Sequence, residues 1–155
     1  MPEKPTINKE KRARFFWMPA LSSISLQCQT RPSEMSAKNV KETRVYKLAF
    51  ELAMEIFEIT KRFPGEERFS LTDQIRRSSR SGCICLIEAY RKKKYKAHFV
   101  AKATDSDMEN SETSGWLDFS IACKYITPEE YKRLSAKCAE VGRLLNHMIN
   151  NPEQY

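Results

Sequence analysis

Apolar residues recur every three or four positions along much of this 155-residue chain, and this spacing restricts the fold more than any other feature. The first such run contains Val45, Leu48, Leu52, Ile56, Ile59 and Phe63. This spacing places side chains on one face of an α-helix. The chain also has only 4 glycines, and its apolar runs are short and periodic. We therefore predict an all-α fold.

The periodic segments predict helices over residues 40–63, 70–91, 96–125 and 127–150. Ser70 with Asp73 forms a candidate capping pair for the second helix, and Thr127 followed by Pro128 marks the start of the fourth. Short connections between long helices favour antiparallel neighbours. We expect an up-down-up-down four-helix bundle over residues 39–152, although residues 105–113 are poorly apolar for a core segment.

Residues 1–38 carry no comparable pattern, and we expect a disordered N-terminal extension. The basic stretch 9–14 followed by the apolar residues 15–21 loosely imitates a secretory signal, but Pro19 interrupts it. Met35 is a natural start for the domain, so an upstream mis-called start codon is one account of the extension. No apolar run has the roughly 18–20 residues that span a bilayer. We expect a cytoplasmic protein without membrane contact.

Positive charge is concentrated in residues 68–102, where ten Lys and Arg face two acids, a local +8 against +7 for the whole chain. A concentrated positive surface attracts polyanions such as nucleic-acid backbones. Tyrosines beside the cations could stack on unpaired bases. The predicted nucleic-acid-binding residues are Arg76, Arg77, Arg80, Tyr90, Arg91, Lys92, Lys93, Lys94, Tyr95 and Lys96. The competing interpretation is a solvated turn whose cations complement a helix C-terminus.

The side chains that could act in catalysis or bind a metal do not form a recognisable catalytic or metal-binding set. Asp105, Glu109 and Glu112 share a helix face, yet neither His98 nor His147 follows a Glu by three positions, as a di-iron bundle requires. We expect no cofactor and no enzymatic activity. Glu88, Glu109 and Glu112 are predicted to form structural ion pairs, with the acids of the third helix meeting Arg76, Arg77 or Arg80. The five cysteines lack metal-site spacing, and we interpret them as reduced, buried small side chains.

A second apolar stripe lies beside the first on the helix predicted over residues 40–63. It contains Tyr46, Ala49, Phe50, Ala53 and Phe57. So wide an apolar sector exceeds what one neighbouring helix covers. Either the helix sits centrally in the bundle, or it also contacts another subunit. We predict an oligomer interface at Tyr46, Phe50 and Phe57.

Several strings in the chain resemble the bacterial 23S rRNA intervening-sequence protein family. They are Val45-Tyr46-Lys47-Leu48-Ala49, Phe63-Pro64, Phe69-Ser70-Leu71-Thr72-Asp73-Gln74-Ile75-Arg76-Arg77, Glu88-Ala89-Tyr90-Arg91-Lys92, Glu112-Thr113 and Trp116-Leu117-Asp118-Phe119. The resemblance covers about residues 40–152. Family members usually show Asn-Ile-Ala-Glu after the serines of the second helix, whereas this chain has Cys85 and Ile87 in place of the Asn and the small residue.

The resemblance implies a four-helix bundle that assembles as a ring-shaped homopentamer and has no established enzymatic activity. The leading hypothesis is an oligomer that binds rRNA or another structured nucleic acid. The alternative is a protein–protein scaffold or accessory subunit, for example of a reverse transcriptase or a ribosomal partner, that does not touch nucleic acid.

Overall fold

The computed structural model describes residues 39–155, which form four long helices. These are α1 (Arg44–Ile59), α2 (Leu71–Arg91), α3 (Lys96–Ala122) and α4 (Pro128–Asn150). Four short 3₁₀ turns accompany them: η1 (Val40–Glu42), η2 (Thr60–Arg62), η3 (Gly65–Phe69) and η4 (Pro152–Gln154). No strand occurs in residues 39–155, so the all-α prediction is confirmed there. The predictions for residues 1–38 and for Cys28 lie outside the described residues.

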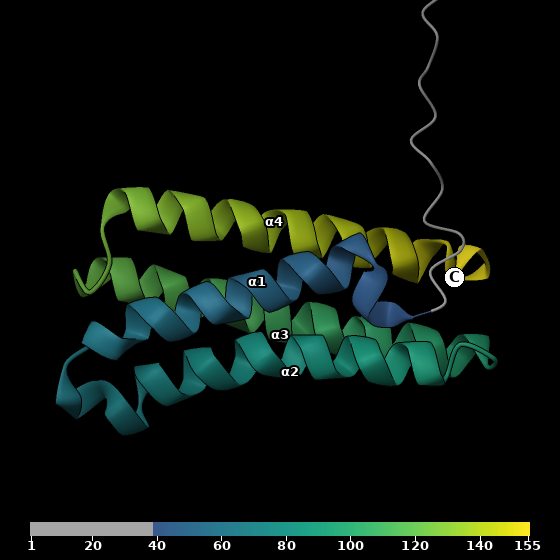
Figure 1. Cartoon of the computed structure of the whole chain (residues 1–155), viewed down its shortest axis with the longest axis horizontal. Coiled ribbons are helices and arrows are strands. Elements are labelled where there is room, and N and C mark those ends of the chain that lie inside the picture. The colour runs from purple at the N-terminus through teal and green to yellow at the C-terminus, as the bar shows by residue number, and fades with distance from the viewer. Residues whose placement is uncertain (1–38) are drawn as a thin grey trace, which may run out of the picture. The chain divides into compact units, whose positions relative to one another are not determined.

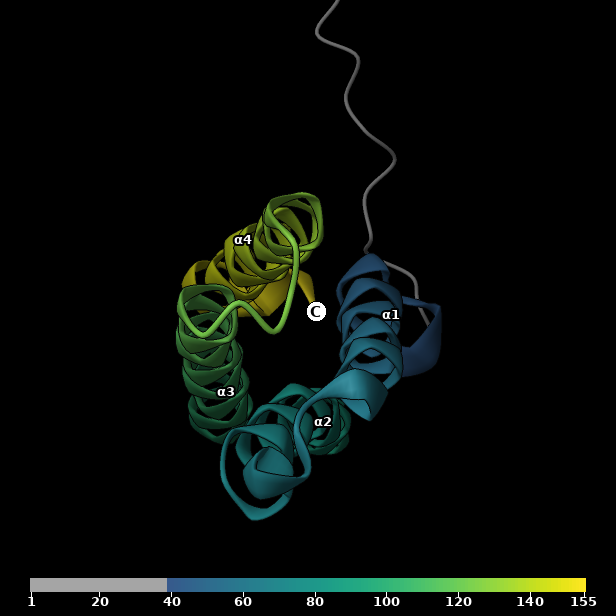
Figure 2. The ribbon, with the colours of Figure 1, turned by 90° about the vertical axis from the view of Figure 1, so that its left-hand side faces the viewer.

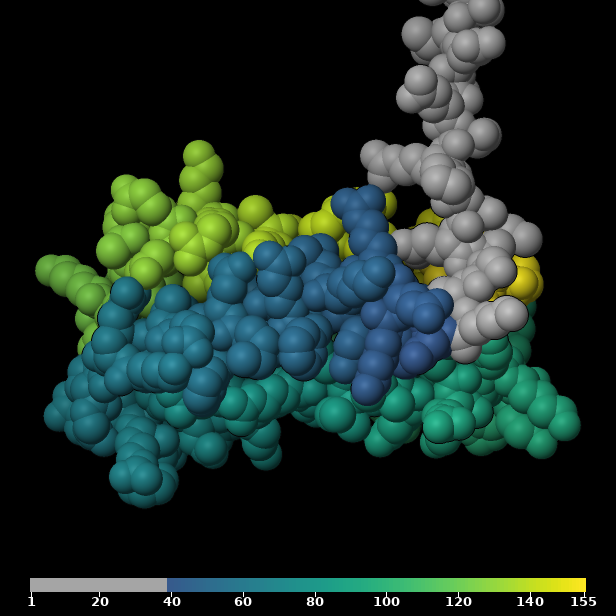
Figure 3. Space-filling view, in the orientation of Figure 1, coloured from purple at the N-terminus to yellow at the C-terminus, as the bar shows by residue number. Residues whose placement is uncertain are grey.

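The four helices lie side by side, and each contacts the next along the chain. α4 also contacts α1, so the contacts run around a closed circuit (Figure 2). The connections from α1 to α2 and from α3 to α4 lie at one end, and the connection from α2 to α3 lies at the other (Figure 1). The space-filling view shows α1 between α4 and α2 on one face (Figure 3). The basic connection between α2 and α3 therefore occupies one end of the four helices.

The core consists of two clusters of buried side chains along the length of the helices. One contains Val45, Leu86, Phe99 and Leu145, and the other contains Leu52, Ile56, Ile75, Leu117 and Leu134. The first predicted stripe of α1 is buried except for Leu48, which is partly buried. The predicted stripe of α4 is also buried from Leu134 to Met148, with Tyr131 partly exposed at its start.

The first helix is shorter than the pattern predicts, because Thr43 begins it and 3₁₀ turns flank it. Thr43 has an extended backbone, and its hydroxyl accepts a hydrogen bond from the Tyr46 N–H at 3.3 Å. Val40–Glu42 is consequently a separate turn. At the other end the chain tightens into η2 before Pro64, which cannot continue a helix because it lacks an N–H.

The predicted caps have different outcomes in α2 and α4. The Ser70 side chain makes no capping bond, and its hydroxyl donates to the Glu67 carboxylate. Glu67 accepts the Leu71 N–H at 3.3 Å and so serves the start of α2. In α4 the prediction is confirmed. Thr127 Oγ1 accepts the Glu130 N–H at 3.2 Å, and the Glu130 carboxylate accepts the Thr127 N–H at 2.9 Å.

Candidate nucleic-acid interface

The connection between α2 and α3 presents a continuous run of exposed cations. Arg91 ends α2, Lys92–Lys94 form the turn, and Lys96 begins α3. Backbone bonds hold the turn, because the Lys92 N–H donates to the carbonyls of Glu88 and Ala89, and the Tyr95 N–H donates to the Lys92 carbonyl at 2.8 Å. The side chains therefore project from a fixed backbone into solvent.

The cations of this turn are scarcely neutralised. Within residues 39–155, none of Arg91–Lys94 has a carboxylate within 4.0 Å. Lys96 lies 3.4 Å from Glu153, and both side chains are exposed. Exposed ion pairs of this kind contribute little to folding stability and leave both charged groups accessible to solvent. The positive field at this end of the molecule is thus available to an external anion.

The two tyrosines of the turn have different environments. Tyr95 is 60% exposed, with the Lys94 ammonium 5.8 Å from its ring centroid. Tyr90 is half-buried, and its ring packs edge-on to Phe99 with centroids 6.3 Å apart. Only Tyr95 of the pair presents most of its ring to solvent, where a base could stack.

Arg76, Arg77 and Arg80 form a second basic group, separate from the turn. Arg80 and Arg91 are eleven residues apart on α2, or about 16 Å along the helix axis. Arg76 Nε donates to Thr60 Oγ1 at 2.7 Å, and an Arg77 nitrogen donates to Gln74 Oε1 at 3.0 Å. The ten predicted residues therefore lie in two places on the structure.

Of the three acids predicted to form ion pairs, Glu88 forms one within residues 39–155, whereas Glu109 and Glu112 accept hydrogen bonds from neutral groups. Glu88 pairs with Lys102 at 2.8 Å, and Lys102 also lies 3.1 Å from Asp105. The hydrogen bond from Lys102 lowers the pKa of Glu88 below its ordinary value. Glu109 instead accepts a hydrogen bond from Ser81 at 2.8 Å, and Glu112 accepts one from the Trp116 indole at 3.0 Å. The expected contacts with Arg76, Arg77 and Arg80 are not those that the structure shows.

The residues predicted for an oligomer interface follow one edge of α1. Phe50 is 51% exposed, and Tyr46 stacks on it with ring centroids 6.1 Å apart. Phe57 is half-buried because the Arg76 and Arg80 guanidinium groups lie over its ring, at 5.0 and 5.4 Å from its centroid. These side chains lie on the edge of α1 that faces α2.

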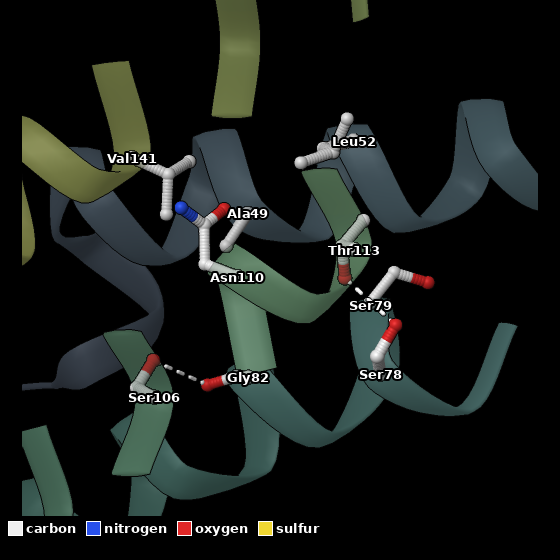
Figure 4. A pocket seen from close by; sticks show the side chains of 9 residues that line it. All are labelled: Ala49, Leu52, Ser78, Ser79, Gly82, Ser106, Asn110, Thr113 and Val141. Atoms are coloured by element: carbon white, nitrogen blue, oxygen red, sulfur yellow. Dashed lines mark hydrogen bonds between the residues drawn. The ribbon is translucent and has the colours of Figure 1, made fainter. Parts of the chain in front are cut away.

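The polar middle of α3 is part of the interior, which the sequence pattern did not reveal. Ser78 and Thr113 share a buried hydrogen bond of 2.9 Å, and Ser106 donates to the Gly82 carbonyl at 2.9 Å (Figure 4). Asn110 donates to the Cys138 carbonyl at 3.0 Å. Ser78, Gly82, Ser106, Asn110 and Thr113 line a cavity of about 10 Å³. Small polar side chains on α2 and α3 therefore satisfy one another where the helices approach closely.

The cysteines do not share one environment. Cys83 and Cys138 are buried, which raises their thiol pKa values to about 11 and about 12. Cys85 is half-buried and lines the outer groove between α2 and α3, while Ile87 packs against the core. Cys123 is exposed, so the prediction of burial is wrong for it. A thiol with a raised pKa is a poor nucleophile near neutral pH, since little thiolate is present.

Neither a metal centre nor a membrane span is found in the described part of the chain. Within residues 39–155, no group of three or more His, Cys, Asp and Glu side chains could hold a metal ion. Among the helices of these residues, none is long and apolar enough to cross a bilayer.

Comparisons with known proteins give a family and a related structure. The family model for the 23S rRNA-intervening sequence protein matches residues 41–147. A crystal structure of a Bacteroides thetaiotaomicron protein of unknown function, from the S23 ribosomal protein family, is 30% identical, with a TM-score of 0.63. The match covers 68% of this chain and 95% of that one. A comparison with curated proteins found no match. The described fold and both matches agree with the resemblance in the sequence, and the chain belongs to the 23S rRNA-intervening sequence protein family.

Proposed function

We propose that this chain is a non-enzymatic protein that binds structured RNA through the turn between α2 and α3. The observation that carries the proposal is the run of exposed cations from Arg91 to Lys94, without a carboxylate within 4.0 Å in residues 39–155. Phosphate groups are the common polyanionic partners of such a surface. Tyr95 adds an exposed aromatic ring for an unpaired base.

The proposal includes an up-down-up-down four-helix bundle that assembles as a homopentamer and acts in the cytoplasm. The exposed aromatic edge of α1 supports assembly, because burying an exposed apolar side chain such as Phe50 in an interface lowers the free energy. In a ring, the basic turn would repeat once per subunit around one rim. Repetition would strengthen the field at that rim and let one RNA engage several turns.

A salt series with a matched control tests RNA binding. We would measure fluorescence anisotropy of a labelled, structured RNA with the wild type, with Lys93→Gln/Lys94→Gln, and with Lys124→Gln/Lys132→Gln. All four lysines are exposed. Lys124 belongs to the connection from α3 to α4 and Lys132 to the beginning of α4, at the end of the helices opposite the α2–α3 turn. Each lost phosphate contact should reduce the slope of log affinity against log salt by about 0.7 for a single-stranded contact.

We expect the turn variant to bind more weakly with a slope shallower by about 1.4, and the control variant to match the wild type. Equal slopes for the two variants would show that the turn is not the binding site. Wild-type affinity that does not change with salt would contradict a phosphate-based interaction altogether.

A further inference from the structure

Two exposed apolar surfaces of opposite charge meet along α2. The first, here the aromatic–arginine surface, lies at the α1–α2 edge and consists of Tyr46, Phe50, Met54, Phe57, Arg76 and Arg80. Phe50 is 51% and Met54 43% exposed. The two guanidinium groups lie over Phe57, so the positive charge is held beside the aromatic side chains. No carboxylate lies within 4.0 Å of either guanidinium in residues 39–155.

The second, here the acidic surface, is a depression between α2 and α3. Its apolar members Ile84 and Met108 are 53% and 66% exposed. Its carboxylates are Glu88, Asp105, Glu109 and Glu112. Lys102 is the one cation that lines the depression in the described chain, and it pairs with Glu88 and Asp105. Glu109 and Glu112 therefore leave this surface with negative charge beside exposed apolar atoms.

The two surfaces complement each other and do not complement themselves. Two aromatic–arginine surfaces face to face would bring guanidinium groups against guanidinium groups, and two acidic surfaces would bring carboxylates against carboxylates. Like charges in contact at an interface cost several kcal/mol. A contact between one surface of each kind would bury Phe50 and Met108 and place Arg80 near Glu109 or Glu112.

The placement of the surfaces also fits a closed assembly. The α1–α2 and α2–α3 edges are neighbouring sides of the circuit of helices, which meet at α2, and not opposite sides (Figure 2). A contact between two different surfaces repeats from copy to copy, and it closes into a ring when the rotation between copies allows. Surfaces on neighbouring sides turn each copy relative to the last, whereas surfaces on opposite sides would extend a filament.

We propose that copies of this chain assemble head to tail, with the aromatic–arginine surface of one copy against the acidic surface of the next. This inference rests on the homo-oligomer of the proposed function and names its contacting surfaces. It also divides the ten basic and aromatic residues predicted as one site, since Arg76 and Arg80 serve assembly and the α2–α3 turn remains free for RNA.

Charge reversal tests the pairing. We would measure the mass of each variant by light scattering after size exclusion, with circular dichroism as a check of folding. At the contact between Arg80 of one copy and Glu109 of the next, Arg80→Glu places two carboxylates and Glu109→Arg places two guanidinium groups. Each single variant should therefore dissociate at least about tenfold more readily. Arg80→Lys and Glu109→Gln are the conservative controls, and the Gln oxygen can still accept the Ser81 hydrogen bond.

A double variant and a mixture of the two single variants distinguish the loss of opposite charges at the interface from damage to the fold. The double variant Arg80→Glu/Glu109→Arg restores opposite charges and should regain the wild-type mass. An equimolar mixture of the single variants should also associate, with the two variants alternating, because like-charged contacts disfavour association of a variant with itself. Such alternation cannot produce a ring with an odd number of subunits.

The results separate this inference from the proposed function. If the wild type assembles but Glu109→Arg leaves its mass unchanged, or if neither the double variant nor the mixture restores association, the head-to-tail pairing is wrong while the oligomer stands. A wild type that remains monomeric at every concentration would overturn both the oligomer and this inference. RNA affinity of the turn is measured separately and does not decide between them.

Discussion

Glycine-to-alanine substitutions measure how closely α3 and α4 approach. Gly115 lies within α3, and a Cβ added there would have no atom within 4 Å beyond its immediate chain neighbours and the helix's own backbone. Replacing glycine by alanine in a helix interior stabilises by about 0.8–1.0 kcal/mol. With a urea m-value of about 2 kcal/mol/M, Gly115→Ala should raise the unfolding midpoint by roughly 0.5 M. It serves as the reference for unhindered substitution.

Gly142→Ala should behave differently, because the added Cβ would lie 3.3 Å from the Asn110 amide nitrogen. That nitrogen donates to the Cys138 carbonyl at 3.0 Å, so displacing it weakens a hydrogen bond between α3 and α4. An unmet polar group costs about 1–3 kcal/mol, which offsets or exceeds the helix gain. We expect a net change between about zero and 2 kcal/mol of destabilisation.

An Asn110→Ala background isolates the cause. With the amide removed, Gly142→Ala should recover the gain of about 1 kcal/mol seen at Gly115. The assay is urea unfolding followed by circular dichroism at one protein concentration, because assembly would change the apparent stability. If Gly142→Ala stabilises as much as Gly115→Ala in the wild-type background, α3 and α4 do not approach as closely as described.

Three further outcomes can be measured. The hydrogen bonds from Arg62 and from the Thr127 N–H lower the pKa of Glu130 below its ordinary 4.5. Ionised Glu130 therefore adds to the free energy of unfolding above pH 4.5, and this addition is lost as the pH falls through the lowered pKa of the folded state. Glu130→Gln should therefore be less stable than the wild type near pH 7, and the difference should shrink below about pH 4 in urea unfolding. Leu145→Ala should cost about 2–5 kcal/mol in the same assay, because Leu145 is fully buried. Tyr95→Ala should weaken RNA binding by roughly 1–3 kcal/mol in anisotropy, whereas unchanged affinity would exclude stacking on this ring.

Local patterns predicted the helices because their signals are short-range. The Thr127 cap and the stripe from Leu134 to Met148 depend only on spacing along the chain, and both are found as expected. The Ser70 cap failed because a competing group, Glu67, is supplied by the η3 turn, whose backbone could not be foreseen from the pattern. Helix ends are set by such competitions, and the sequence alone does not rank them.

The polar middle of α3 resisted sequence reasoning for a different reason. Ser106 and Thr113 are small polar residues that a pattern of apolar spacing counts as surface, yet both are buried. Each finds its partner on α2, at Gly82 and Ser78, and such pairing depends on the register between two helices. Intrahelical spacing contains no information about that register, so the contacts appear only in the assembled fold.

The ten residues predicted as one nucleic-acid site lie in two separate places for a related reason. The sequence places ten basic and aromatic residues within 21 positions of one another, from Arg76 to Lys96, but a helix separates residues along its axis by about 1.5 Å each. Arg80 consequently lies near Phe57 of α1 and not near the turn. Proximity in sequence predicted one polyanion site, whereas neighbouring helices give each basic group its own environment. The turn, whose residues 91–96 are all exposed, keeps its charge in solvent, and this exposure suits it to an external phosphate.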